Sequence, residues 1–116
     1  MTRRLVSIAA ACGVLAPAGS ASAHTGIKSK SPRAGSTASR DLSVVKVNFE
    51  ARVTDATLVI KRSGSKVSRG DGTLANRSRQ VRARLRSSRA GRYSATVRWL
   101  SSDGHVQSKT WSFRIR

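Results

Sequence analysis

Apolar and polar side chains alternate along much of the chain, and this period of two predicts β-strands. In residues 77–86, Val81, Ala83 and Leu85 alternate with arginines, which predicts a strand with one buried face and one wet, basic face. From residue 24 onward, no ten-residue stretch has the 3.6-residue apolar period of an amphipathic helix. Further strands are expected at residues 25–30, 41–52, 57–61, 92–100 and 106–116, with a short one starting at Val67.

Turns that contain glycine separate these runs. They are expected at residues 63–65, at Gly70-Asp71-Gly72, at residues 90–91 and at Asp103-Gly104, where an Asp-Gly pair between two alternating runs is a strong hairpin signal. About seven short strands joined by turns predict an all-β fold, an antiparallel β-sandwich of the immunoglobulin-like kind. Most of the core's bulk is expected to come from five inward-facing aromatic residues: Phe49, Tyr93, Trp99, Trp111 and Phe113.

The first 23 residues have the features of a secretory signal peptide. Two arginines near the start precede an apolar run at residues 5–16, which is short for a membrane span, and an Ala-Ser-Ala cleavage site follows at residues 21–23. We therefore predict export to the periplasm or another extracytoplasmic part of the cell envelope. Residues 24–116 are then a single domain whose first residue is His24.

The single cysteine, Cys12, lies within the predicted signal peptide. The exported domain is therefore expected to have neither a disulfide nor a thiolate metal ligand. The alternative is that Cys12 is a lipidation site, which would leave His24 inside the chain.

The exported domain is strongly basic. The chain has 23 Lys and Arg against 5 Asp and Glu; without Arg3 and Arg4, 21 basic residues remain against 5 acidic ones, a net charge of +16. This charge predicts attraction to an anionic envelope surface, although a solvated face that keeps the domain soluble explains it as well. Nucleic acid is not an expected partner, because no exposed aromatic pattern suited to base stacking is present.

Both histidines of the chain stand where a metal site can form. His24 at a new amino terminus offers the α-amine and the imidazole, and the predicted hairpin adds a carboxylate from Asp103 and an imidazole from His105. Three nitrogens and one oxygen form the tetragonal donor set that Cu(II) prefers. The amine must lose its proton to bind, so affinity is expected to rise with pH through about 7.7–8.0. A lone histidine or an Asp in a turn is more often structural, and it is the pairing of the two places that favours a metal.

The sequence also resembles the CopC-type periplasmic copper-resistance proteins. Seven segments carry the resemblance: Ala-Ser-Ala-His at 21–24, Ser-Pro-Arg-Ala-Gly-Ser at 31–36, Val-Lys-Val-Asn-Phe-Glu at 45–50, Gly-Arg-Tyr at 91–93, Arg-Trp at 98–99, Ser-Asp-Gly-His at 102–105 and Trp-Ser-Phe at 111–113. The resemblance implies a cupredoxin-like Greek-key β-sandwich that binds one Cu(II) per chain through His24, Asp103 and His105. It further implies a role in copper homeostasis or resistance without enzymatic turnover, with an inner-membrane copper transporter of the CopD type as partner.

Two departures from the family pattern change what is expected of this chain. The family has a glutamate near the copper, but the motif here reads Phe-Glu-Ala-Arg, so Glu50 is only a candidate neighbour of the ligands. Some members carry a methionine-rich Cu(I) site, whereas the one methionine here is Met1. Only the Cu(II) site is therefore expected.

Two other functions remain open. An amine and two imidazoles on copper are also the donor set of oxidative polysaccharide monooxygenases, and such an enzyme would consume oxygen or peroxide with a reductant. A metal-free basic module of the cell envelope would instead bind anionic surfaces in a salt-dependent way that is independent of His105.

Overall fold

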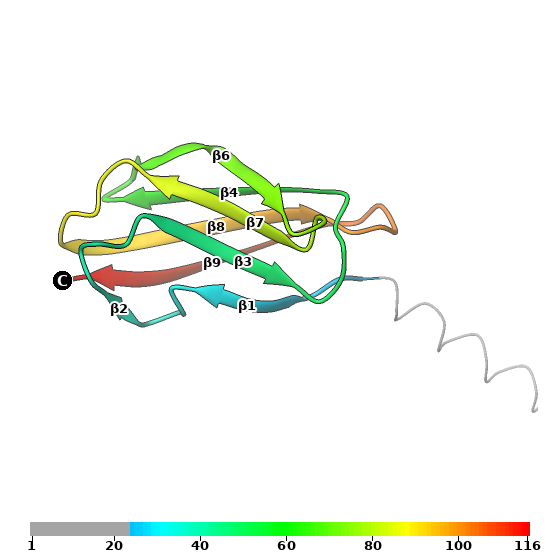
Figure 1. The fold of residues 1–116 in the computed structure, drawn as a ribbon, viewed down its shortest axis with the longest axis horizontal. Helices are drawn as coiled ribbons and strands as arrows, with labels where there is room; N and C mark the ends of the chain where they lie inside the picture. The colour runs from blue at the N-terminus through cyan, green and yellow to red at the C-terminus, as the bar shows by residue number, and fades with distance from the viewer. Residues whose placement is uncertain (1–23) are drawn as a thin grey trace, which may run out of the picture.

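The computed structural model describes residues 24–116, which form nine β-strands (Figure 1). The predicted signal peptide and Cys12 lie outside the described residues. Within residues 24–116, no helix has the length and hydrophobicity needed to span a membrane. The strands are β1 (Ile27–Ser31), β2 (Thr37–Ala38), β3 (Val44–Phe49), β4 (Asp55–Arg62), β5 (Ser65–Lys66), β6 (Ser68–Ala75), β7 (Gln80–Leu85), β8 (Gly91–Leu100) and β9 (Val106–Ile115).

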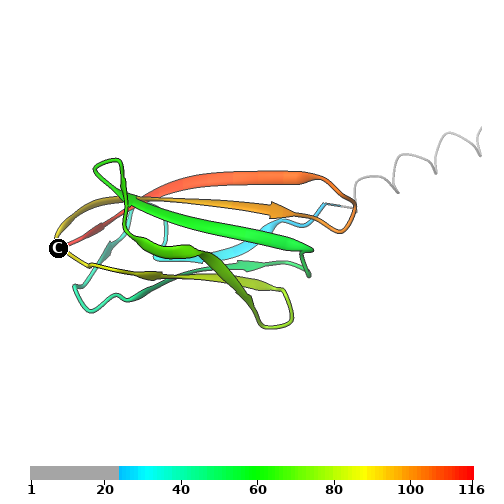
Figure 2. The ribbon, with the colours of Figure 1, turned by 90° about the horizontal axis from the view of Figure 1, so that it is seen from above.

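The strands pair into two sheets that stack face to face. One sheet has the order β1-β3-β7-β6, and the other has the order β2-β9-β8-β4-β5. Figure 2 shows the two layers, with β4, β8 and β9 in one and β3 and β7 in the other. All pairs are antiparallel except β2 with β9. The predicted antiparallel β-sandwich is confirmed, and the strand count exceeds seven because β2 and β5 are two-residue strands.

The core lies between the sheets and is built by the alternation seen in the sequence. Successive side chains of a strand point to opposite faces, so every second residue is buried along β3, β7 and β8, along β4 as far as Ile60, and in the second half of β9 from Trp111 onward. All five aromatic residues predicted to fill the core are at most 5% exposed. Each large apolar side chain buried in this way contributes about 1.5–3 kcal/mol relative to an exposed one. The buried core residues are Val45, Val47, Phe49, Val53, Ala56, Leu58, Ile60, Val81, Ala83, Leu85, Tyr93, Ala95, Val97, Trp99, Trp111, Phe113 and Ile115.

The turn predicted at Gly70-Asp71-Gly72 is wrong, because this segment lies inside β6. The pairing of β6 with β7 slips between Arg69 and Thr73, and the two glycines take up the bulge with φ of 64° and 96°. At Gly72 the backbone also passes close to β4, since a Cβ there would lie 2.9 Å from the backbone nitrogen of Leu58. The glycines therefore serve a bulge and a close approach rather than a chain reversal.

Candidate metal centre

Side chains from two distant parts of the sequence meet at one end of the sandwich. His24 lies just before β1, and Asp103 and His105 lie in the turn that joins β8 to β9. Figure 1 shows the start of the described chain beside this turn, at the end opposite the C-terminus. Among residues 24–116, these three form the one group of histidine and acidic side chains whose donor atoms are close enough to share an ion. The structure thus brings together all three residues predicted as ligands.

The three donor atoms are close to one another. His24 Nε2 lies 3.0 Å from His105 Nδ1 and 3.2 Å from Asp103 Oδ2. His105 Nδ1 lies 2.7 Å from the same carboxylate oxygen. The two imidazole rings meet edge to face, at a centroid distance of 4.7 Å. One carboxylate oxygen therefore bridges two rings whose planes are nearly perpendicular.

These separations are close to those between neighbouring ligands of a first-row divalent ion. Nitrogen ligands lie about 2.0–2.1 Å from such an ion, as they do for zinc, so neighbouring donors at right angles are separated by about 2.9 Å. The three measured separations are 2.7, 3.0 and 3.2 Å. In a square-planar arrangement one of the three pairs would be trans, at about 4 Å. A tetragonal ion therefore needs one ring to move outward by about 1 Å, and both rings are exposed enough to do so.

The β8–β9 turn holds Asp103 and His105 by short-range hydrogen bonds. The backbone nitrogen of Ser101 donates to the carbonyl of His105 (2.9 Å), and that of Gly104 donates to the carbonyl of Ser101 (2.9 Å). Gly104 adopts a φ of 88°, a conformation that glycine tolerates best. Asp103 Oδ1 accepts from the backbone nitrogen of His105 (3.1 Å), so the carboxylate caps its own turn while Oδ2 faces the rings. The Asp-Gly hairpin predicted here is confirmed.

The position of His24 depends on its neighbour Thr25, which is only 5% exposed. Trp99 Nε1 donates to the carbonyl of Thr25 (2.8 Å), and the backbone nitrogen of Thr25 donates to Ser101 Oγ (3.3 Å). Ser101 Oγ in turn donates to Gln107 Oε1 (2.9 Å). We call Thr25, Trp99, Ser101 and Gln107 the anchor. It ties the chain after His24 to β8 and β9, and no sequence pattern pointed to Thr25, Ser101 or Gln107.

The electrostatics of the site keep Asp103 ionised. The hydrogen bond from the His105 ring is the largest effect on the Asp103 carboxyl and lowers its pKa below 3.8. Partial burial raises this pKa. The His105 backbone N–H and the charges of the two rings lower it further. The Asp103 side chain is 17% exposed, whereas those of His24 and His105 are 52% and 68% exposed. The site therefore offers a formed carboxylate behind two rings that face solvent.

Glu50 is not part of the group of three and lies against Gly26. Its backbone nitrogen donates to the carbonyl of Gly26 (2.9 Å), and a Cβ on Gly26 would lie 2.6 Å from its Oε1. The Glu50 side chain thus packs against the chain two residues after His24. Its position beside the metal ligands stays a prediction.

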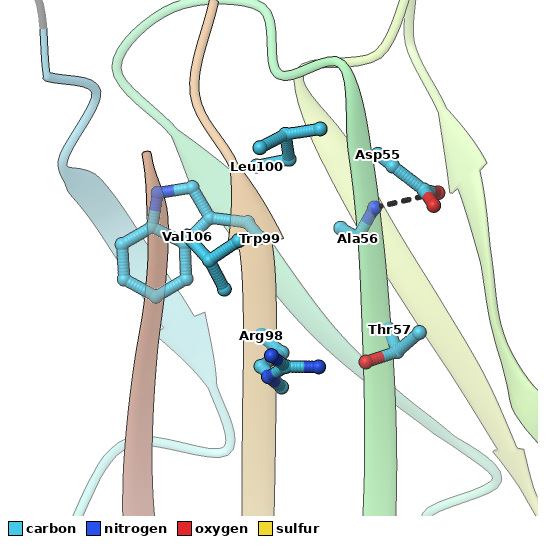
Figure 3. Close-up of a pocket in the computed structure, with 7 residues that line it drawn as sticks. All are labelled: Asp55, Ala56, Thr57, Arg98, Trp99, Leu100 and Val106. Atoms are coloured by element: carbon cyan, nitrogen blue, oxygen red, sulfur yellow. Dashed lines mark hydrogen bonds between the residues drawn. The ribbon is translucent and has the colours of Figure 1, made fainter. Parts of the chain in front are cut away.

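A shallow hollow of about 180 Å³ lies next to the site on the outer face of the β2-β9-β8-β4-β5 sheet (Figure 3). Val106 follows His105 directly and is 55% exposed, the one large apolar side chain so exposed in the part of the chain that the structure describes. Leu100 pairs with Val106 across the hairpin and shares the hollow. An apolar rim therefore adjoins the exposed rings.

Comparison with known proteins identifies a domain family and several similar structures. A family model described as the CopC domain matches residues 27–116, beginning three residues after His24. The crystal structure of CopC from Methylosinus trichosporium OB3b is similar at 26% identity and a TM-score of 0.67, covering 79% of this chain and 93% of that one. PcoC, a methionine-rich copper resistance protein from Escherichia coli, is similar at 23% identity and a TM-score of 0.67, covering 81% of this chain and all of that one. A comparison with curated proteins found no match.

Proposed function

This chain belongs to the CopC domain family, and on that premise we propose that it is an exported protein that binds one Cu(II) and sequesters or delivers it. One observation carries the proposal. His24 and the 103–105 turn are far apart in the sequence, yet His24 Nε2, Asp103 Oδ2 and His105 Nδ1 lie 2.7–3.2 Å from one another, so the His24 imidazole stands against the turn. The export step removes residues 1–23 and makes His24 the amino terminus.

The donor chemistry supports copper(II) in particular. Imidazole nitrogen and carboxylate oxygen suit Cu(II), whereas Cu(I) favours cysteine and methionine sulfur. Residues 24–116 contain neither, because the only cysteine is Cys12 and the only methionine is Met1. The methionine-rich character named for the Escherichia coli relative therefore has no counterpart in this domain.

The α-amine of His24 completes the proposed donor set and requires a specific ring orientation. An amine and the Nδ1 atom of the same histidine close a six-membered chelate ring with a metal, whereas Nε2 lies on the far side of the imidazole. In the full chain the His24 nitrogen belongs to a peptide bond, and Nε2 faces the site. We propose that cleavage before His24 and rotation of its ring bring the amine and Nδ1 together onto the ion.

Exposure of the site fits transfer of copper to a partner. Both rings are more than half exposed, so a partner can reach the ion directly. An inner-membrane copper transporter of the CopD type is the proposed partner, and the periplasm or extracytoplasmic envelope is the proposed location. No enzymatic turnover is part of the proposal.

A Cu(II) titration followed by EPR tests the amine-anchored site. Two proteins are compared, one that begins at His24 and one with a single additional residue before it. We expect one-to-one binding by the first, with a tetragonal type 2 spectrum and an affinity that rises through about pH 7.7–8.0. The second should bind much more weakly and with less dependence on pH. Equal weak binding by both proteins would remove His24 as the anchor and the proposal with it.

The same copper-loaded protein distinguishes the remaining functions. Reductant-dependent consumption of oxygen or peroxide that is lost in His105→Ala would support an oxidative enzyme instead. Absence of Cu(II) binding, together with retention on anionic surfaces, would support a metal-free envelope module.

A further inference from the structure

Four cationic side chains form a compact patch on the outer face of the β1-β3-β7-β6 sheet. Lys46 of β3 is directly opposite Arg82 of β7, and Arg84 of β7 is directly opposite Arg69 of β6. These two rows are adjacent, because Arg82 and Arg84 are two residues apart on one strand and share a face. We call Lys46, Arg69, Arg82 and Arg84 the basic patch.

The basic patch is not neutralised within the described part of the chain. The ion pairs of residues 24–116 involve Lys66 with Asp71 and the two histidines with Asp103, and none includes a member of the patch. Like charges directly opposite each other on neighbouring strands are destabilising. The strand register therefore holds these four cations close together, and a bound anion would reduce the repulsion between them.

A groove runs through the patch. It has a volume of about 320 Å³ and is lined by Val44, Thr73, Ala75 and the three patch arginines. Small and apolar side chains form the surface between the guanidinium groups, so an anion can approach them closely. Arg82 is also oriented from its own strand, because its Nε donates to Gln80 Oε1 (2.6 Å). Guanidinium groups bind phosphate in a planar, bidentate manner that lysine does not reproduce.

We propose that the basic patch docks this protein on an anionic lipid bilayer through the phosphates of its headgroups. A bilayer matches the patch in charge, because the four cations spread over three strands of an open sheet face and a plane of headgroups can reach the groove and Lys46 at the same time. Each Lys or Arg at an anionic membrane surface strengthens binding about fivefold. Strand β3 begins and β7 ends near the C-terminal end of the sandwich, away from His24, so docking leaves the 103–105 turn free (Figure 1).

Binding to lipid vesicles tests the proposal with two charge-matched variants. Residues 24–116 hold every described strand and the whole buried core. This protein is sedimented with vesicles of phosphatidylglycerol and phosphatidylcholine, or of phosphatidylcholine alone, at 0.15 M salt. The patch variant carries Arg69→Gln, Arg82→Gln and Arg84→Gln.

The control variant carries Lys61→Gln, Arg92→Gln and Arg114→Gln on the outer face of the other sheet, where Arg92 is opposite Arg114. We expect a loss on the order of 100-fold in binding for the patch variant. The control variant is expected to lose less than about threefold, because the sandwich separates its charges from the docked face by more than the ~8 Å Debye length. Cu(II) binding is expected to be unchanged in both.

Three outcomes would overturn the proposal. Equal losses in the two variants would mean that net charge alone draws the protein to vesicles. Displacement by millimolar glycerol phosphate would mean that the groove binds a small anion. Tighter, patch-dependent binding to a DNA duplex would mean that the partner is a nucleic acid. Should the triple variant unfold, the single change Arg84→Gln is expected to weaken vesicle binding about fivefold, and an unchanged affinity there would refute the assignment equally well.

Discussion

Replacing Trp99 by Phe separates the anchoring of His24 from the general stability of the core. The indole of Trp99 donates to the carbonyl of Thr25 at 2.8 Å, and the side chain is 5% exposed. The phenylalanine leaves that buried carbonyl without its donor, at a cost of about 1–3 kcal/mol. Lost apolar burial adds about 1 kcal/mol. We expect the free energy of unfolding to fall by about 2–4 kcal/mol.

Trp99→Phe should also weaken copper binding. Without the Trp99 hydrogen bond, Thr25 keeps only its bond to Ser101, so the backbone of His24 is held less firmly and must be ordered when the ion binds. Ordering one residue costs about 1–2 kcal/mol, which corresponds to a 5–30-fold increase in Kd.

Trp111→Phe is the matched control. Trp111 is also 5% exposed, and its indole donates to the carbonyl of Pro32 at 2.9 Å. It should therefore lose similar stability while its Kd for Cu(II) stays the same. Urea unfolding followed by circular dichroism gives the first quantity, and competition with a chromophoric Cu(II) chelator gives the second. If both tryptophan variants weakened copper binding equally, or if neither did, the anchor would not position His24.

Two further predictions concern the carboxylate and the β6 bulge. Asp103→Asn should weaken Cu(II) binding, whereas the charge-matched change Asp71→Asn should not, as titration would show. His105 lowers the pKa of Asp103, so the stabilisation from this pair is complete above the unfolded-state pKa and is lost as pH falls through the lowered value. Asp103→Asn should therefore cost stability near neutral pH and nothing in strong acid. A stability difference that did not change with pH would contradict the assigned cause. Gly72→Ala should lower the free energy of unfolding by about 1–3 kcal/mol more than Gly70→Ala. Both glycines have positive φ, but only a Cβ at Gly72 would lie 2.9 Å from the Leu58 nitrogen. Equal losses in urea unfolding would refute the close approach.

Local chemistry explains which features were predictable. Alternation in β7, β8 and β9 identified the buried faces, because successive side chains of a strand must point to opposite sides of the sheet. The Asp103-Gly104 hairpin followed from the backbone freedom of glycine. Strand β2 was missed because Thr37 and Ala38 carry no alternating pattern, and they become a strand only by pairing with Arg114 and Ile115 of β9.

The candidate site also has a part that the sequence predicted and a part that it did not. His24, Asp103 and His105 were identified by donor chemistry together with the predicted cleavage site and hairpin, and the structure places their side chains within hydrogen-bonding distance. Their roles as ligands remain predictions. No sequence pattern predicted the anchor, because Thr25 lies in a polar stretch and nothing in the neighbouring residues indicates that it is buried.

The sequence by itself thus determined the strands that carry an alternating pattern, their buried faces, and the donor types of His24 and the 103–105 turn. These features depend on side-chain period and chemistry within a few residues. Only the tertiary structure decided that Thr25 is tied to Trp99 and Ser101, that Gly72 passes over β4, and that Arg69, Arg82 and Arg84 share one groove. These contacts join segments far apart in the chain. They depend on sheet register and on the stacking of the two sheets, which the pattern along any single strand does not encode.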